Sequence, residues 1–352
     1  MPSGNRHQDK VCLVTGGAGF IGSHLVDRLI AAGHRVRVID NLASGNLDNL
    51  APHKNDPRLR FVEADIATTS ELTSLAAGVQ WFFHLAALAD IVPSIEQPQR
   101  YHQANVNGTI AALEAARASG VERFVYAASS SCYGLPDQYP TPETAPCRPM
   151  YPYALTKMIG EQYVQHWQQC YGLPTASLRF FNVYGPRART NGTYGAVFGV
   201  FLAQKLAGKA FTVVGDGKQS RDFTFVTDIA SALVAAARRA APGAIYNVGS
   251  GGTYTIQHLV ELLGGPVEYV PERPGEPRCT FADTTKITEE LGWQPQVSFE
   301  DGVAEMLRCI EQWREAPVWD RSSIDVATRD WFRYLGPKNE TNAAIAGAGD
   351  PA

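Results

Sequence analysis

A glycine-rich loop that follows an apolar run constrains this chain most. The stretch TGGAGFIGSHL, residues 15–25, contains four glycines and comes directly after Val11–Val14. Glycine permits positive φ and close approach of the backbone to a ligand, and a helix N-terminus offers N–H groups and a positive dipole end to an anion. We therefore predict a pyrophosphate-binding loop, although a tight strand-to-helix turn that binds nothing would use the same residues.

The residues around this loop favour the binding site. KVCLV is typical of a buried strand, FIGSHLVDRLIAAG has the apolar spacing of a helix that stops at Gly33, and RVRVID is a second strand. Asp40 ends that second strand about 20 residues beyond the glycines, where a carboxylate accepts hydrogen bonds from a ribose 2′-OH and repels a 2′-phosphate. No arginine follows in DNLASG, so we predict NAD rather than NADP.

Strands and helices alternate through the first half of the chain. The strand-like pieces LRFVEAD, QWFFHLAA, RFVYAAS and TASLRFFNVYG are interspersed with helical stretches at 98–119 and 153–171. Such alternation predicts an α/β fold with a doubly wound parallel sheet. After Gly185 the elements shorten, although AIYNVGSGG resembles one more sheet strand. We expect a dinucleotide-binding domain at 1–185 to which 223–250 returns, a smaller α/β, mainly substrate-binding domain at 186–336, and a disordered tail at 337–352.

Composition excludes several classes of partner. The net charge of −4 gives no attraction to nucleic acid, and neither the polar N-terminus nor any apolar run predicts export or a membrane span. The six cysteines form no C-x-x-C pair, which predicts reduced thiols and a cytoplasmic protein. The eight histidines lack metal-ligand spacing, so we predict no metal and expect His84 to be a hydrogen-bonded residue at a strand end.

Tyr153 and Lys157 in YPYALTK are candidate catalytic residues. They are four positions apart on a predicted helix and so share one face. A neighbouring ammonium and a positively charged nicotinamide would favour phenolate, and lowering the tyrosine pKa by about three units takes roughly 4 kcal/mol. Ser129 in YAASSSCYG ends a predicted strand at the edge where ligands of doubly wound folds bind. An ordinary amphipathic helix and a serine-rich turn would also account for these residues.

The ordered motifs TGGAGFIG, HLAA, NVNGT, SSSCYG, YALTK, RFFNVYGPR and GDGKQSRDFTFVTD resemble the extended short-chain dehydrogenase/reductase family, specifically its nucleotide-sugar 4-epimerases. The resemblance runs from about Lys10 to about Trp313. It implies that Tyr153 takes the proton of the sugar 4-OH, that Lys157 holds the nicotinamide ribose and lowers the tyrosine pKa, and that Ser129 shares the proton. Tightly bound NAD would be reduced and reoxidised within one turnover, on a UDP-sugar used in polysaccharide biosynthesis.

The resemblance also assigns binding residues, with Asp65 and Ile66 beside the adenine and Asn105 in the cofactor channel. The expected cofactor contacts are Gly16, Gly19, Phe20, Ile21, Gly22, Asp40, Asn41, Ser44, Gly45, Asp65, Ile66, Ala86, Asn105, Tyr153, Lys157 and Phe180. The expected substrate contacts are Ala89, Ser129, Asn182, Arg187, Arg221, Arg273, Glu276 and Thr280. Guanidinium groups bind diphosphate oxygens in a fork, which independently suits the arginines, although most arginines are solvated surface charges.

Other reactions stay open at this point. Related dehydratases carry an Asp-Glu pair, and decarboxylases a Glu, where this chain has Ser130 and Ser131. A UDP-glucuronate 4-epimerase is a further alternative, disfavoured by Asp90 in the loop expected to face the sugar and favoured by Arg187 and Arg189. A non-catalytic NAD-binding module is the least expected reading, because the serine, tyrosine and lysine are all present.

Assembly and substrate range follow from the same resemblance. It implies a homodimer in which helices 98–119 and 153–171 of both copies form a four-helix bundle. It also implies that Thr280, four residues after Glu276, leaves room beside C2 of the sugar for an acetamido group. VWDRSSIDVATRDWFRYLG resembles an added helix with an aromatic face, for which we predict only packing or a dimer contact.

Overall fold

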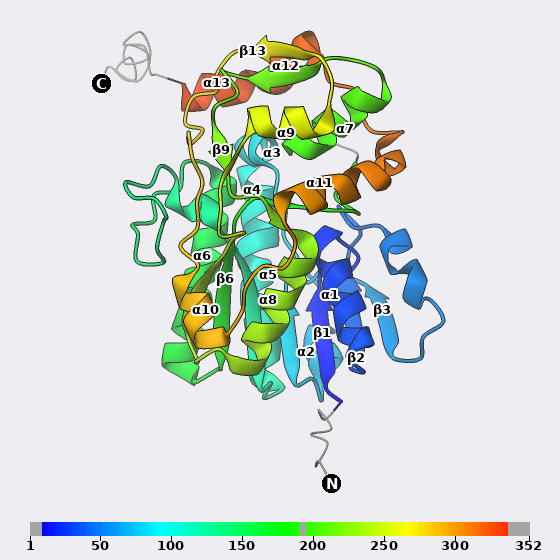
Figure 1. The fold of residues 1–352 in the computed structure, drawn as a ribbon. Coiled ribbons are helices and arrows are strands. Elements are labelled where there is room, and N and C mark those ends of the chain that lie inside the picture. Colours follow the sequence, from blue (N-terminus) through cyan, green and yellow to red (C-terminus); the bar gives the residue numbers. More distant parts are fainter. Residues whose placement is uncertain (1–8, 191–194, 337–352) are drawn as a thin grey trace, which may run out of the picture.

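Seven parallel strands form the central sheet in the computed structural model, which describes residues 9–190 and 195–336 (Figure 1). The order β11-β6-β5-β4-β1-β2-β3 places β1 inside the sheet, with consecutive strands added outward on either side. The strands are β1 Val11–Thr15, β2 Arg35–Asp40, β3 Leu59–Glu63, β4 Trp81–His84, β5 Arg123–Ser129, β6 Thr175–Phe180 and β11 Ala244–Val248. The predicted doubly wound α/β fold is confirmed.

Helices cover both faces of this sheet, so its strands are buried on both sides. On one face, α1 (Phe20–Ala31) and α8 (Val226–Arg239) pack on alternate residues such as Cys12 and Val14. Leu13, between those two residues, belongs to the core of the opposite face. That face is covered by α2 (Leu72–Ala76), α5 (Gly108–Ala118) and α6 (Pro152–Tyr171).

The predicted helix at 98–119 is interrupted. The structure has α4 (Pro98–His102), a π-helical turn at Gln103–Asn107 and then α5. Short elements at the sheet edge complete this part of the molecule: the 3₁₀ turns Leu47–His53 and Ser130–Tyr133, and α3 (Ile91–Glu96).

Most of the remaining elements sit above the carboxyl ends of the strands, at the top of Figure 1, whereas α10 (Thr285–Leu291) lies lower, beside the sheet. Three two-stranded ribbons replace the continuous sheet there: β7 (Val183–Tyr184) with β10 (Thr224–Phe225), β8 (Phe211–Val214) with β13 (Val267–Val270), and β9 (Ser220–Arg221) with β12 (Tyr254–Thr255). The helices are α7 Val197–Leu206, α9 Ile256–Leu263, α10 Thr285–Leu291, α11 Phe299–Arg308, the 3₁₀ turn Ile310–Trp313, α12 Arg321–Ala327 and α13 Arg329–Leu335. Stacked aromatic rings form the core, such as Tyr184 on Phe198 with centroids 4.5 Å apart.

Two segments from the second half of the chain pack on the central sheet. β11 pairs with β6, and α8 packs against α1, as expected for residues 223–250. Ile287 and Leu291 of α10 also belong to the core of the sheet, although the sequence places them in the substrate domain. The domain division at residue 185 stays a prediction, and the expected disordered tail at 337–352 lies outside the described residues.

Candidate active site

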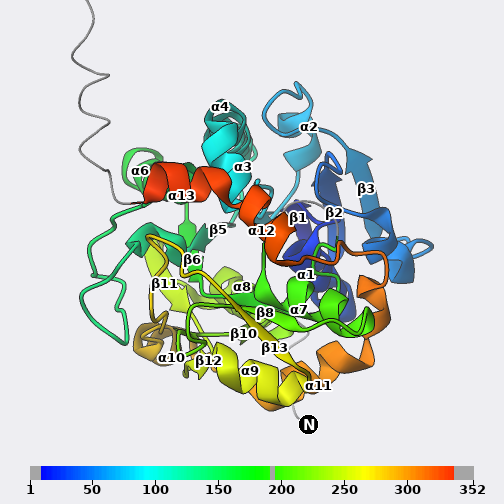
Figure 2. The same cartoon turned by 90° about the horizontal axis from the view of Figure 1, so that it is seen from above.

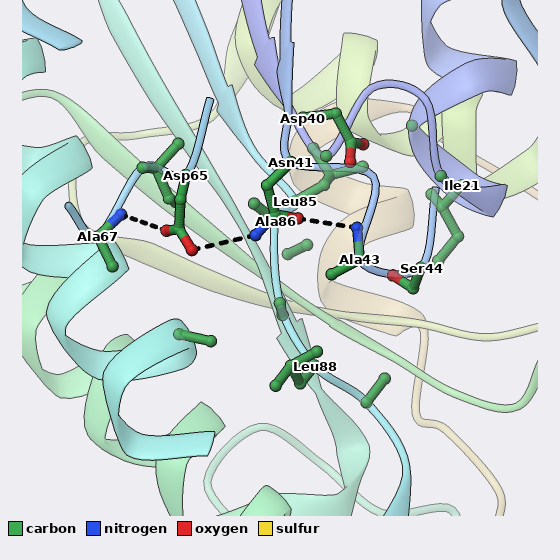
Figure 3. A pocket seen from close by; sticks show the side chains of 18 of the residues that line it. Ile21, Asp40, Asn41, Ala43, Ser44, Asp65, Ala67, Leu85, Ala86 and Leu88 are labelled. Carbon is green, nitrogen blue, oxygen red and sulfur yellow. Dashed lines mark hydrogen bonds between the residues drawn. The ribbon is translucent and has the colours of Figure 1, made fainter. Parts of the chain in front are cut away.

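A cavity of about 450 Å³ opens at the carboxyl ends of the central strands (Figure 3). It lies between the loops after β1, β2, β3 and β4 and the start of α6. Most residues that the sequence assigns to the cofactor line it: Gly16, Gly19, Phe20, Ile21, Gly22, Asp40, Asn41, Ser44, Asp65, Ile66, Ala86, Tyr153, Lys157 and Phe180.

The glycine loop shows why side chains are missing there. Gly16 has φ +72°, and a Cβ on it would lie 2.8 Å from the backbone nitrogen of Ala86. A Cβ on Gly22 would lie 2.1 Å from the carbonyl oxygen of Gly16. The loop therefore packs directly on the β4 exit and on the first turn of α1. The N–H groups of that turn, at Phe20 and Ile21, have no partner within the helix and lie at the cavity.

Two carboxylates mark one end of the cavity. Asp40 ends β2 and accepts hydrogen bonds from the backbone N–H groups of Ala18 (3.1 Å) and Leu42 (2.9 Å). Burial raises the pKa of Asp40 despite these bonds. Asp65 accepts from Asn41 Nδ2 at 3.1 Å, as Figure 3 shows. Carboxylate oxygens in this position suit ribose hydroxyl groups and disfavour a further phosphate.

Two of the predicted cofactor residues lie behind the cavity lining. Gly45 packs against Asp40, because a Cβ on it would lie 2.9 Å from Asp40 Oδ1. Asn105 is buried; its Oδ1 accepts from the N–H of Leu88 at 2.8 Å, and its Nδ2 donates to Thr156 Oγ1 at 3.0 Å. Asn105 therefore fixes the loop after β4 to α6.

Several lining residues were missed by the sequence analysis: Ala43, Leu85, Ala87, Leu88, Arg100, Gln103, Ala104, Ala127 and Ala128. Many are small residues at the ends of β4 and β5. The alanines in HLAALA and YAAS could have indicated them, because a ligand needs space beside the strand ends.

Two of the predicted catalytic residues, Tyr153 and Lys157, line the cavity, and the third, Ser129, lies beside Tyr153 behind the lining. Tyr153 and Lys157 lie one turn apart at the start of α6, and the hydroxyl group of Tyr153 hydrogen-bonds with that of Ser129 at the end of β5. Ser129 Oγ lies 2.8 Å from Ser131 Oγ. Ser131, which the sequence did not single out, also hydrogen-bonds with Tyr151, and the ring of Tyr151 stacks on that of Tyr153. The structure therefore joins four hydroxyl groups in one network.

Burial dominates the electrostatics of this network. It raises the pKa of Tyr153, and the hydrogen bond from Ser129 offsets only part of that effect. Burial also lowers the pKa of Lys157 to about 7, and the Lys157 ammonium lies 4.3 Å from the centroid of the Tyr126 ring. The expectation that Lys157, together with a bound nicotinamide, lowers the tyrosine pKa stays a prediction, because it concerns the site with the cofactor in place.

His84 lies behind the site as a hydrogen-bonded strand residue, as predicted. Its Nδ1 is 2.8 Å from Thr15 Oγ1 and its Nε2 is 3.0 Å from Thr109 Oγ1. Burial lowers its pKa to about 3, so the ring is neutral at pH 7. Within residues 9–190 and 195–336, no group of three His, Cys, Asp or Glu side chains is placed to hold a metal ion.

Of the predicted substrate contacts, Ala89 lines the cavity. Five others form two hydrogen-bonded or ion-paired groups outside the lining. In the first group, Arg221 Nη2 donates to Glu276 Oε1 at 2.7 Å, and Arg273 Nη1 lies 3.7 Å from Glu276 Oε2. In the second, Thr280 Oγ1 donates to Asn182 Oδ1 at 2.7 Å.

A buried aspartate ties this region together and was not identified from the sequence. Asp222 accepts hydrogen bonds from the backbone N–H groups of Ser250 (2.6 Å) and Ala282 (3.0 Å), and its own N–H donates to Thr280 Oγ1. Burial raises the pKa of Asp222 to about 6. The motif SRDF contains Asp222, but only the tertiary contacts reveal what it joins.

The structure places Arg187 apart from these groups. Its Nη1 lies 2.8 Å from Asp27 Oδ2 on α1, and its N–H donates to Gln312 Oε1. Arg189 does approach the loop after β4, where its Nη1 donates to Asp90 Oδ2 at 2.8 Å. The two arginines expected near the sugar thus each form an ion pair with an aspartate.

None of the helices in the described part of the chain is both long enough and apolar enough to cross a membrane.

Comparison with known proteins gives consistent matches. Residues 12–249 match the model of the NAD dependent epimerase/dehydratase family, and residues 263–306 match that of GDP-mannose 4,6 dehydratase. The UDP-glucose 4-epimerase of Mycolicibacterium smegmatis is 41% identical over 301 residues, covering 83% of this chain and 96% of the relative.

Two solved structures extend the comparison. The UDP-N-acetylglucosamine 4-epimerase from Methanobrevibacter ruminantium, in complex with UDP-N-acetylmuramic acid, superposes with a TM-score of 0.82 at 34% identity, covering 86% of this chain and 99% of that one. The dTDP-glucose 4,6-dehydratase from Streptomyces venezuelae, with NAD bound, superposes with a TM-score of 0.79 at 34% identity, covering 87% and 97%.

Proposed function

This chain belongs to the NAD-dependent epimerase/dehydratase family, and on that premise we propose that it is a UDP-sugar 4-epimerase of the UDP-glucose and UDP-N-acetylglucosamine type. The observation that carries the proposal is the placement of Tyr153 and Lys157 at the cavity with Ser129 beside Tyr153, next to serines at positions 130 and 131. This arrangement offers a proton acceptor for a sugar hydroxyl group and no carboxylate at those two positions.

The residues at the cavity fit NAD. The absence of a Cβ at Gly16 and Gly22 lets the loop backbone pack directly on the β4 exit and on the first turn of α1, and that turn offers N–H groups to a pyrophosphate. Asp40 would hold the adenosine ribose, and Lys157 would hold the nicotinamide ribose. When bound, oxidised NAD supplies a hydride acceptor and a positive charge that favours the phenolate form of Tyr153.

Tyr153 acts in this proposal as the base that takes the proton of the 4-OH, and Ser129 shares that proton through its hydroxyl group. Lys157 offers a second charge beside the same site, with a pKa of about 7 that suits proton exchange near neutral pH. Loss of hydride would leave a 4-keto sugar. This sugar must rotate within the site so that the hydride returns to the opposite face of C4. Arg221 and Arg273 would hold the diphosphate while the sugar turns.

The alternative reactions have less support. A dehydratase or decarboxylase needs further acid and base groups, and this chain has serine at both positions where those relatives carry carboxylates. A UDP-glucuronate 4-epimerase would need a cation for the uronate, whereas Arg187 pairs with Asp27 and Arg189 with Asp90. A non-catalytic module would have no use for the hydrogen-bonded Ser129 and Tyr153.

Incubation with UDP-glucose and UDP-N-acetylglucosamine tests the proposed reaction. We expect the C4 epimer of each sugar, read from the anomeric protons by NMR, with no change of mass. A product lighter by water would indicate a dehydratase, and one lighter by carbon dioxide from UDP-glucuronate would indicate a decarboxylase.

A homodimer through α5 and α6 is part of the same proposal. These helices pack side by side, and Leu155 and Tyr171 of α6 are exposed. A symmetric four-helix bundle would cover both residues. Light scattering should report a dimer at micromolar concentration and a monomer for Leu155→Glu. A monomeric wild type would refute the dimer. The six free thiols further suit an enzyme of the cytoplasm.

A further inference from the structure

The two C-terminal helices have no role in the account so far. α12 and α13 lie beyond residue 306, where the family matches end. Figures 1 and 2 show them in red across the top of the molecule, and α13 packs against α3 above the carboxyl edge of the sheet. The helix pair therefore lies on the same side of the molecule as the substrate residues.

Trp331 of α13 contacts the loop that carries Arg273. The indole Nε1 donates a hydrogen bond to the carbonyl oxygen of Pro274 at 2.7 Å, and the guanidinium carbon of Arg273 lies 5.6 Å from the centroid of the indole ring. Trp331 is only 6% exposed. One buried side chain thus contacts both the backbone of the loop and its arginine.

The same indole reaches the hydroxyl network at the catalytic residues. Its centroid lies 6.3 Å from the ring of Tyr151, which stacks on Tyr153 at 6.4 Å and hydrogen-bonds with Ser131. Trp331 therefore lies between the arginine loop and the tyrosine pair, and it joins the two parts of the proposed substrate site.

The helix pair is itself anchored to the element that precedes the arginine loop. Arg321 Nη2 donates to the carbonyl oxygen of Tyr269 in β13 at 3.0 Å, and Asp320 and Ser323 form a capping box at the start of α12. Gly275, with φ +71°, bends the loop after β13. A loop held at both ends loses less entropy when it binds a ligand, so the anchor favours affinity.

We propose that Trp331 is a positioning residue that holds Arg273 ready for the diphosphate of the nucleotide sugar, so that α12 and α13 complete the substrate site. The inference rests on the proposed function for the identity of the ligand. It assigns to Trp331 an effect on nucleotide affinity rather than on the chemical step, because the indole contacts the arginine loop and no reacting atom.

Calorimetric titration with UDP, together with steady-state kinetics on UDP-glucose, tests this role in Trp331→Ala. We expect the Kd for UDP and the KM to rise about tenfold, with kcat within about twofold of wild type. Phe332→Ala is the matched control, because Phe332 is the next residue of α13 and is 40% exposed. That control should leave all three quantities unchanged.

A double-mutant cycle with Arg273→Ala separates positioning from general stability. In the Arg273→Ala background, Trp331→Ala should change the Kd for UDP by less than about twofold. Trp331→Phe keeps a ring under Arg273 but lacks the donor to Pro274, so it should give an intermediate Kd. If Trp331→Ala fails to fold, Trp331→Phe takes its place in the cycle.

Equal effects of the Trp331 change in both backgrounds would overturn the inference, as would unchanged UDP affinity in Trp331→Ala or a wild type that does not bind UDP. The titration needs no turnover. A wild type that binds UDP but converts no UDP-sugar would refute the proposed function, and the cycle would still decide the role of Trp331.

Discussion

The half proposed to bind the cofactor, which is the central sheet with its helices, and the half above it proposed to bind the substrate build their sites in different ways. On the cofactor side, backbone approaches backbone: Gly22 has no room for a Cβ beside the carbonyl oxygen of Gly16. On the substrate side, side chains from distant segments pair, as Arg221 does with Glu276 and Thr280 with Asn182. A local spacing of glycines can encode the first kind of site, whereas only tertiary contacts create the second.

Tyr153, the proposed catalytic base, stands where the two halves meet, so its removal should have the largest effect. Tyr153→Phe keeps the ring that stacks on Tyr151 but removes the hydroxyl group bonded to Ser129. We expect turnover of UDP-glucose to fall at least about 10³-fold, with bound NAD and melting temperature unchanged. Near-normal turnover would place the base elsewhere.

A pair of glycine substitutions compares the two halves directly. Gly22 in α1 and Gly199 in α7 are both helical, but a Cβ on Gly199 would meet nothing closer than Trp313 Nε1 at 3.6 Å. Gly22→Ala should lower the free energy of unfolding by about 2–4 kcal/mol and abolish co-purification of NAD. Gly199→Ala should be neutral or stabilising by up to about 1 kcal/mol. Similar results for both variants would remove the distinction that we draw.

The buried carboxylate of Asp222 tests whether the substrate-binding half depends on side-chain contacts. Asp222→Asn keeps one oxygen and turns its amide N–H group toward the backbone donor of either Ser250 or Ala282, so we expect the free energy of unfolding to fall by about 2–3 kcal/mol in denaturant titrations. Asp216→Asn is the control, because the exposed ion pair of Asp216 with Arg278 should be worth less than about 1 kcal/mol. Equal losses would argue against a special role of Asp222.

Thr280 offers the smallest test, on selectivity. Thr280→Tyr should lower kcat/KM for UDP-N-acetylglucosamine at least about tenfold while largely keeping activity on UDP-glucose, since the larger ring fills the space beside C2. Thr280→Ser keeps the hydroxyl group that bonds with Asn182 and should accept both sugars. If the tyrosine variant treats both substrates alike, Thr280 does not control this choice.

The sequence predicts the features that depend on local spacing and misses those that depend on tertiary contacts. The order of elements, the glycine loop, Asp40 and the pairing of Tyr153 with Lys157 all depend on spacings within a few turns of the chain. Asp222, Ser131 and Trp331 gain their roles from residues that are near in space, and no spacing marks them. Burial, which raises the pKa of Tyr153 in the chain alone, also depends on packing that the sequence does not show.

Epimerisation of UDP-glucose in ²H₂O tests the central claim most directly. In this account, Tyr153 moves only the hydroxyl proton, which exchanges with solvent, while the hydrogen on C4 leaves and returns as hydride within the site. NMR of the product should therefore show UDP-galactose with protium at C4 and no deuterium elsewhere in the hexose carbon frame. Deuterium at C4 or C5 of the product would contradict the proposed reaction.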